Sequence, residues 1–263
     1  LLDILDYFIA LQNKYQWGPN YYYHYAAINN IHPTYIQNLL DDKRYNLDQR
    51  KSALNSLKSK KSNIFSEDSL KSAIYKKNQF KDNFNANSFF RNKNICILAS
   101  GPSGHKFSKK VINYIKKNKP IVLSLNINQY MPKKYIDYYV SSYEYRVFFD
   151  AQSFNKINKQ IIMPYSLFKK HLSIQLNNDK IIDYGLKVKN DSFNAFNTYC
   201  ELDSPLAIAY ALAFCSIAFA KSVNLAFVDG YDDDELKNSE ISNYIKKFKS
   251  KNQKIKLKFI TPS

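Results

Sequence analysis

Residues 94–106 read Asn-Ile-Cys-Ile-Leu-Ala-Ser-Gly-Pro-Ser-Gly-His-Lys, an apolar run that leads into a loop of small residues and then into a helical pattern. The chain has five glycines in 263 residues, and two of them, Gly101 and Gly104, lie in this loop. Glycine is favoured where a backbone turns sharply or approaches another group closely. The stretch therefore predicts a strand, a tight loop and a helix.

Downstream of this stretch, short apolar runs alternate with helical patterns. Continuous apolar strands separated by helices are typical of a mostly parallel sheet with helices on both faces, so the expected fold class is α/β. Ser204 is expected to cap the third helix, with Pro205 at its first position. The predicted strands span 95–99, 121–125, 136–141, 160–163, 181–188, 223–228 and 255–260, and the predicted helices span 106–118, 143–154, 204–220 and 232–250.

The first part of the chain has a different character. Residues 1–88 contain short helical patterns, many aromatic residues and no strand signal, which predicts a small all-helical subdomain before an α/β domain at 89–263. The chain begins Leu-Leu-Asp within a helical pattern and without Met, so we expect a fragment of a longer polypeptide.

Charge and length exclude some classes of partner. The net charge of +17 and the pI near 9.5 suggest nucleic acid, but the lysines are scattered and form neither a basic helix nor an arginine-rich stripe. We therefore predict no nucleic-acid partner. The most apolar segment, 206–220, is too short to span a bilayer, which needs about twenty residues, so no membrane partner is expected.

Cysteine and histidine usage points to a cytoplasmic protein without a metal site. Cys96, Cys200 and Cys215 lie far apart inside apolar runs, which favours buried free thiols in a reducing compartment. The four histidines have no spacing typical of metal ligands. They are His24, His32, His105 and His171.

Three polar clusters follow predicted strands, and the carboxyl ends of parallel strands meet at one edge of a sheet, where ligands bind. The loop at 100–104 offers backbone N–H groups, two hydroxyls and a helix N-terminus, which suit a phosphate. The amides at 126–129 suit a base or ribose, and the acidic run at 229–235 suits a divalent cation. The predicted nucleotide-binding residues are Ser100, Gly101, Pro102, Ser103, Gly104, Asn126, Asn128, Asp229 and Gly230.

Each cluster also has a purely structural interpretation. The loop at 100–104 can be a tight turn, and Asn126 and Asn128 can be ordinary turn formers. Acidic residues at 229–235 are also what the start of a helix favours. His105 and His171 are candidate acid–base groups, although a lone histidine is more often structural. The catalytic residues, if any, are not predicted.

The α/β half resembles a group of bacterial proteins with a Rossmann-like fold, in which the first strand ends in a Gly-Pro-Ser loop. The resemblance is carried by residues 99–103, 126–129 and 204–230. The group includes sialyltransferases of surface-glycan synthesis and pterin pyrophosphokinase-like proteins. In the sialyltransferases, this loop and an Asn after the second strand contact a cytidine nucleotide. Ser100 stands where that pattern often has Asn.

The first ninety residues are similar to the helical segment that follows the barrel in aldolases resembling hydroxymethylglutaryl-CoA lyase and 4-hydroxy-2-oxovalerate aldolase. The similarity is carried by residues 15–20, 30–35 and 42–45, and the ending 259–263 also looks like such fusions. It implies that this chain is the C-terminal accessory region of an aldolase-type lyase of surface-carbohydrate metabolism. The lyase barrel, with its metal site, is then expected in the same polypeptide.

Three functions are left open by the sequence. The first is an accessory region that binds a nucleotide such as CMP, or a nucleotide-sugar. The second is a glycosyltransferase that uses a CMP-sugar. The third is a non-catalytic assembly module, and a homo-oligomer stays open with each of them.

Overall fold

The computed structural model describes residues 49, 75, 79–170, 172, 175–230 and 235–262, without the side chains of Tyr145 and residues 235–237. The helical subdomain predicted for 1–88 lies largely outside the described residues, as do His24, His32, His171 and most of the acidic run at 229–235. The predicted boundary between residues 88 and 89 stays a prediction.

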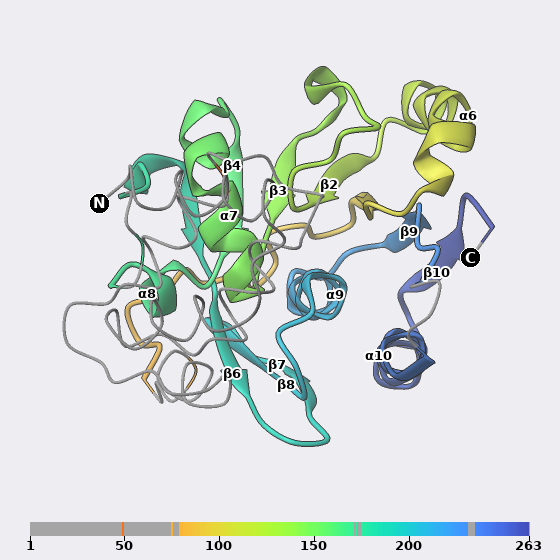
Figure 1. Cartoon of the computed structure of the whole chain (residues 1–263). Coiled ribbons are helices and arrows are strands. Elements are labelled where there is room, and N and C mark those ends of the chain that lie inside the picture. Colours follow the sequence, from red (N-terminus) through yellow and green to blue (C-terminus); the bar gives the residue numbers. More distant parts are fainter. Residues whose placement is uncertain are drawn as a thin grey trace, which may run out of the picture.

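A seven-stranded parallel sheet forms the centre of the fold (Figure 1). Its order is β10-β9-β1-β2-β3-β4-β5, and each neighbouring pair is parallel. The expected α/β, Rossmann-like class is thereby confirmed. The strands are β1 (Asn94–Leu98), β2 (Ile121–Leu125), β3 (Tyr138–Val140), β4 (Gln160–Met163), β5 (Ile181–Asp183), β9 (Ser222–Ala226) and β10 (Lys256–Phe259).

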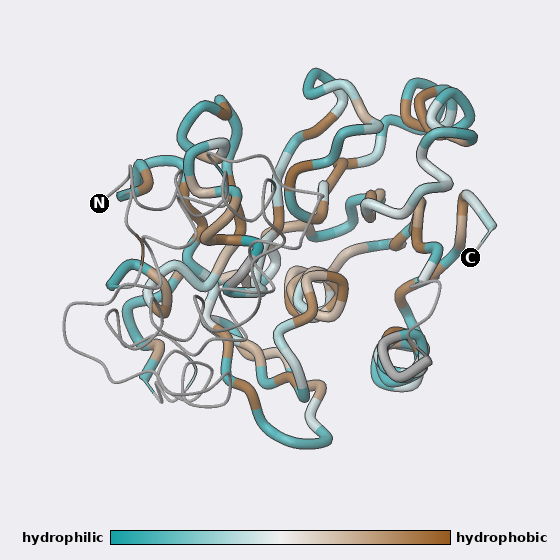
Figure 2. The backbone as a smooth tube through the Cα atoms, viewed as in Figure 1, coloured by the Kyte–Doolittle hydropathy of each residue, from teal (hydrophilic) through white to brown (hydrophobic). Residues whose placement is uncertain are grey.

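Helices flank this sheet. Because β-helix-β connections are right-handed, the helices that lead from β1 toward β4 and the helix that leads from β9 to β10 lie on opposite faces. The helix that precedes β9, α9, is apolar all round and almost wholly buried, and it packs beside α10 (Figures 1 and 2). The helices are α6 (Ser103–Asn118), α7 (Glu144–Lys156), α8 (Tyr165–Phe168), α9 (Ala207–Ile217) and α10 (Glu235–Lys251), with short 3-10 turns η1 (Lys133–Tyr135) and η2 (Asn178–Lys180).

A second, three-stranded sheet was not predicted. It has the order β6-β8-β7, from β6 (Gly185–Val188), β7 (Phe193–Ala195) and β8 (Tyr199–Leu202). The predicted single strand at 181–188 in fact divides at Tyr184, whose ring is buried and whose hydroxyl lies 2.9 Å from Phe196 O and 2.7 Å from Tyr199 O. The chain leaves the main sheet at this residue and enters the small one.

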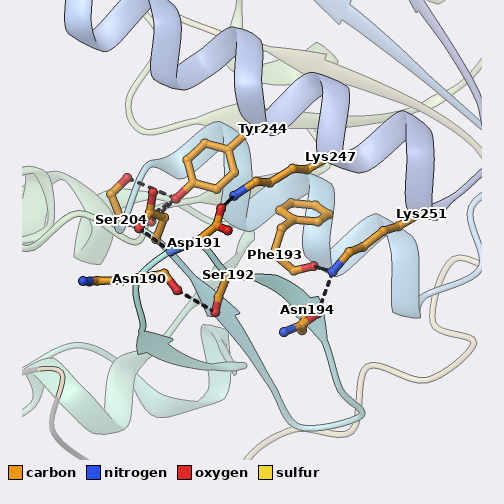
Figure 3. Close-up of polar contacts among 10 residues, drawn as sticks. Asn190, Asp191, Ser192, Phe193, Asn194, Ser204, Tyr244, Lys247 and Lys251 are labelled. Carbon is orange, nitrogen blue, oxygen red and sulfur yellow. Dashed lines mark hydrogen bonds and ion pairs between the residues drawn. The ribbon is translucent and has the colours of Figure 1, made fainter.

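Long polar side chains hold α10 against the small sheet (Figure 3). Lys247 Nζ lies 2.5 Å from Asp191 Oδ1, and Lys251 Nζ donates to Phe193 O at 2.9 Å and to Asn194 Oδ1 at 2.7 Å. Tyr244 is buried, and its hydroxyl accepts the Ser204 N–H at 2.6 Å. We call this set of contacts the α10 clamp.

The α10 clamp explains why the predicted cap of α9 is wrong. Ser204 Oγ donates to Glu240 Oε1 on α10 and makes no capping bond to its own helix. The helix begins two residues later than expected, at Ala207, and its N-cap position is Leu206. Tertiary contact with α10 therefore outweighs the local preference of Ser204 for a cap.

The segment before β1 is part of the same core. Phe80 and Phe90 are 4% and 1% exposed, and backbone N–H groups of this segment reach the small sheet and the end of α9. Ala86 N donates to Asn197 O at 2.7 Å, and Phe90 N donates to Ala218 O at 3.0 Å.

The three cysteines are buried and free, as predicted. Among the described helices, none is both long enough and apolar enough to cross a bilayer.

Candidate functional site

The candidate site lies where the direction of strand progression reverses. From β1 the chain builds outward through β2 to β5 on one side, and through β9 to β10 on the other. The crevice beyond the carboxyl ends of the strands at such a switch point is where open α/β sheets bind ligands. The loops that follow β1, β2 and β9 meet there, and together with the first turn of α6 they contain every predicted nucleotide-binding residue.

Direct hydrogen bonds join the three loops. Asn128 Nδ2 donates to Ala99 O at 2.7 Å, and Ser100 Oγ donates to Leu125 O at 3.2 Å, which ties the loop after β1 to the loop after β2. Ser103 N donates to Asp229 Oδ2 at 2.5 Å, which ties it to the loop after β9. The three clusters that sequence reasoning grouped are therefore neighbours in space.

The two asparagines of the loop after β2 differ in which side-chain hydrogen-bonding groups remain free to contact a ligand. Asn128 is 7% exposed, and its Oδ1 accepts the N–H groups of Tyr130 and Met131 at 2.8 and 3.1 Å. With its amide also bound to Ala99 O, Asn128 shapes the loop. Asn126 uses only Oδ1, which accepts Ser141 Oγ at 2.8 Å, and no described residue accepts a hydrogen bond from its Nδ2.

Left-handed backbone conformations occur in both loops that flank the switch point. Asn126, after β2, has φ 55°, and Phe227, after β9, has φ 62°. Asparagine tolerates the left-handed region, whereas for a bulky residue such as Phe227 it is uncommon and costs about 1–2 kcal/mol. The Phe227 conformation is held by its N–H, which donates to Thr261 Oγ1 at 2.9 Å, and by its carbonyl, which accepts from Gly101 N at 3.1 Å.

Gly101 and Gly104 are needed for close approach. A Cβ at Gly101 would lie 2.4 Å from Asp229 Oδ2 and 2.5 Å from Phe227 O. A Cβ at Gly104 would lie 2.3 Å from the ring of Tyr130, which packs against its backbone. The groups that approach these glycines belong to the protein itself. The two glycines therefore allow the turn to pack between the loop after β9 and the loop after β2.

The backbone N–H groups of residues 101–105 in this turn are already engaged. Gly101 N donates to Phe227 O, Gly104 N to Gly101 O at 3.0 Å and His105 N to Pro102 O at 3.0 Å. Pro102 has no N–H, and Ser103 N is bound to Asp229. A carboxylate of the protein thus occupies the N-terminus of α6, where the helix dipole favours negative charge. The turn is no open cradle of donors waiting for a phosphate.

One polar atom of the turn lacks a partner. Ser103 Oγ is buried and makes no hydrogen bond. Leaving a buried hydroxyl unpaired costs about 1–3 kcal/mol, and native proteins rarely retain such groups without a functional reason. Asp229 is half-buried, and no described residue donates a hydrogen bond to its Oδ1. The turn therefore contains one buried, unsatisfied hydroxyl and one carboxylate oxygen that accepts no hydrogen bond from a described residue.

Sequence reasoning missed two buried acids behind the crevice, Glu144 and Asp150, on α7. Glu144 is fully buried, and Tyr75 Oη donates to its Oε2 at 2.6 Å. Burial, and then the Glu144 charge, raises the pKa of Tyr75 well above its ordinary value. Neither acid carries a local sequence signal, because each one is recognised only by what packs around it.

Asp150 supports the β2 loop from behind. It is 1% exposed, lies 3.6 Å from Arg146 through Oδ2, and accepts a hydrogen bond from the Ile127 backbone, between the two asparagines. Burial raises the pKa of Asp150, although Arg146 and the Ile127 N–H oppose this rise. Its position indicates a supporting role for the loop that carries Asn126.

Of the two histidines that were candidate acid–base groups, only His105 lies within the described residues. His105 is exposed on the first turn of α6, and its ring lies edge-on to Tyr130 with centroids 4.6 Å apart. It therefore lies beside the crevice, with no described acid that would orient it as a base. Within the described ranges, no group of three potential ligands from His, Cys, Asp and Glu is close enough to hold a metal ion.

Comparison with known proteins gives no family. The sequence matches no protein-family model, and no curated protein matches it. The resemblances to sialyltransferases and to the post-barrel segment of aldolases thus stay predictions, and the chemistry of the site is argued from its residues.

Proposed function

We propose that this chain binds a nucleotide or a nucleotide-sugar, such as CMP or a CMP-sugar, at the carboxyl edge of its sheet between β1, β2 and β9. The observation that carries the proposal is the buried, unpaired hydroxyl of Ser103, which lies in the turn at the switch point. A ligand that hydrogen-bonds this hydroxyl recovers the cost of its burial. The available amide of Asn126 and the Asp229 Oδ1 atom, on the two walls, supply further polar contacts.

In the cell, the proposed context is the C-terminal accessory region of an aldolase-type lyase of surface-carbohydrate metabolism in the cytoplasm. The similarity of the first ninety residues to the post-barrel segment of such aldolases supports this context. The lyase barrel would then be the partner in the same polypeptide, and this chain would contribute ligand binding without cleaving carbon–carbon bonds.

A glycosyltransferase that uses a CMP-sugar is the second candidate. It is favoured by the position of Asn126 directly after β2, which corresponds to the Asn that contacts cytidine in the sialyltransferases that the chain resembles. His105, on the first turn of α6 beside the loop, is the described histidine that would serve as the acid–base group.

A non-catalytic assembly module is the third candidate, and the engaged N–H groups of the turn favour it. An empty crevice whose donors are satisfied internally needs no ligand to be stable. This alternative predicts that no nucleotide binds at any concentration compatible with specific recognition.

Isothermal titration calorimetry with CMP, CMP-sialic acid, UDP-sugars and ATP separates the three candidates. Binding without turnover supports the accessory role, and binding with slow hydrolysis of the sugar-nucleotide bond supports the transferase. Ser103→Ala should weaken binding about fivefold, since one hydrogen bond contributes about 1 kcal/mol. Ser108→Ala, farther along α6, is the matched control and should leave affinity unchanged. If none of these nucleotides binds, the assembly role remains.

A further inference from the structure

We infer that the turn at the start of α6 binds hydroxyl groups of the ligand's sugar through Asp229 and Ser103, and that the phosphate lies elsewhere. The inference rests on the proposed function and specifies how the ligand is oriented in that site. It reverses the assignment suggested by the small-residue loop, in which the helix N-terminus received the phosphate.

The first step is that the Asp229 carboxylate already occupies the N-terminus of α6, where a phosphate would be expected to bind. Asp229 Oδ2 accepts the Ser103 N–H at 2.5 Å at the first position of α6. The N–H groups of Gly101, Gly104 and His105 are bound to carbonyl oxygens of the same turn or of Phe227. A phosphate at the first turn of α6 would find no free N–H among residues 101–105.

The second step concerns charge. An ionised carboxylate held at the helix N-terminus repels a phosphate that approaches the same point, and the half-buried position of Asp229 limits screening by solvent. The same carboxylate attracts hydroxyl donors, because a carboxylate oxygen is an acceptor only. Asp229 is therefore suited to neutral, hydroxyl-rich parts of a ligand.

The third step is that two complementary atoms remain available in one turn. Asp229 Oδ1 can accept a hydroxyl hydrogen, and Ser103 Oγ can either donate or accept. A sugar diol needs this combination, since one hydroxyl donates to the carboxylate while its neighbour pairs with the serine. Both atoms are positioned by the turn: Asp229 by its bond to the Ser103 N–H, and Ser103 by its place at the start of α6.

The fourth step is specificity. A site built to hydrogen-bond a hydroxyl discriminates strongly against an analogue that lacks it, because buried polar groups are then left unpaired. The ligand should thus be a ribonucleotide and not a 2′-deoxyribonucleotide, provided that the ribose occupies the turn. If the turn instead binds the transferred sugar, the preference appears between a nucleotide-sugar and the free nucleotide.

The test compares CMP, 2′-deoxy-CMP and CMP-sialic acid by calorimetry on the whole chain. We expect at least a tenfold preference, either for CMP over 2′-deoxy-CMP or for CMP-sialic acid over CMP. Asp229→Asn should reduce that preference to about twofold or less. Asp137→Asn is the matched control, because Asp137 Oδ2 also accepts a backbone N–H, from Val122 at 2.8 Å, at the opposite edge of the sheet.

Two different failures can be told apart. If CMP binds the wild type but neither preference is seen, and Asp229→Asn binds CMP more tightly, then a phosphate lies against the helix and the inference is wrong while the proposed function stands. If no nucleotide binds the wild type, the proposed function fails and the inference fails with it. The comparison of ligands on the wild type does not depend on the folding of any variant.

Discussion

The α6 turn, residues 101–105 at the start of α6 together with Asp229, and the α10 clamp are built from the same kinds of residues. They differ in whether their polar groups have hydrogen-bond partners. In the α10 clamp, Ser204 donates to Glu240. The Ser204 N–H is bound by the Tyr244 hydroxyl, and both Lys247 and Lys251 reach acceptors on the small sheet (Figure 3). In the α6 turn, Ser103 has a buried hydroxyl without a partner, and Asp229 has an oxygen to which no described residue donates a hydrogen bond.

This difference separates a structural polar cluster from a candidate binding site. Buried polar groups that are fully paired stabilise one arrangement of the elements they join. A buried group left unpaired lowers stability, and it is retained where a ligand completes it. The α10 clamp is therefore a structural joint, and the α6 turn is the place to look for function.

The largest expected effect is on the α6 turn. Gly101→Ala would place a Cβ 2.5 Å from Phe227 O, which is a backbone atom and cannot rotate away. We expect a loss of about 3 kcal/mol in the free energy of unfolding, at the upper end of typical overpacking costs. Urea unfolding measures it, with the exposed Lys109→Ala on α6 as control. A near-neutral result would mean that the turn opens readily.

The second prediction concerns the α10 clamp. Ser204→Ala removes a hydrogen bond to the Glu240 carboxylate and leaves that carboxylate partly buried without this donor. Hydrogen bonds to charged groups contribute about 1.5–3 kcal/mol, so we expect a loss of about 2 kcal/mol. Nucleotide binding, measured in the same preparation, should not change. A loss of affinity would show that the clamp and the crevice are coupled.

The sequence predicted the main sheet and the residues of the crevice because both follow from local patterns. Apolar runs of strand length identified β1, β2, β4, β9 and β10 closely. The three polar clusters could then be grouped because each follows a predicted strand, and the carboxyl ends of parallel strands meet at one edge of a sheet. It is for this reason that residues as distant as Ser103 and Asp229 were grouped correctly.

Other features depend on contacts between distant segments and have no local signal. The small sheet consists of strands of three or four residues, too short for a periodicity to be read. Ser204 looks like a helix cap in sequence, and only the approach of α10 makes it a partner of Glu240. Likewise, no pattern shows that Asp229 would fill the helix N-terminus that was predicted to bind phosphate.

The third prediction sets Ser103→Ala against Ser204→Ala. Because the Ser103 hydroxyl is buried without a partner, its removal deletes an unfavourable desolvation and no hydrogen bond. We expect the free energy of unfolding to stay within about 0.5 kcal/mol of the wild type or to rise by about 1 kcal/mol. Thermal unfolding without ligand measures it. A loss as large as that of Ser204→Ala would mean that Ser103 is a structural residue.

The smallest expected effect is the pH dependence of the α10 clamp. The hydrogen bond and charge of Lys247 lower the pKa of Asp191, so this pair stabilises the fold above the ordinary Asp pKa and loses that contribution as the pH falls through the lowered value. Asp191 is exposed, so the effect is small and screened by salt. Lys247→Met should therefore melt slightly below the wild type near neutral pH, and the difference should vanish in strongly acidic solution.

Lys251→Met is the matched control for this last measurement, because Lys251 donates to the neutral acceptors Phe193 O and Asn194 Oδ1. Most of its effect on the melting temperature should persist across the same acidic range, since neither acceptor titrates there and Lys251 lowers the pKa of Asp191 only through its charge, as the last of the causes. If both variants lose their effect together as the pH falls, the whole joint between α10 and the small sheet opens in acid. If only Lys247→Met does, the Lys247–Asp191 pair alone responds to acid and the remaining contacts of the α10 clamp hold the joint.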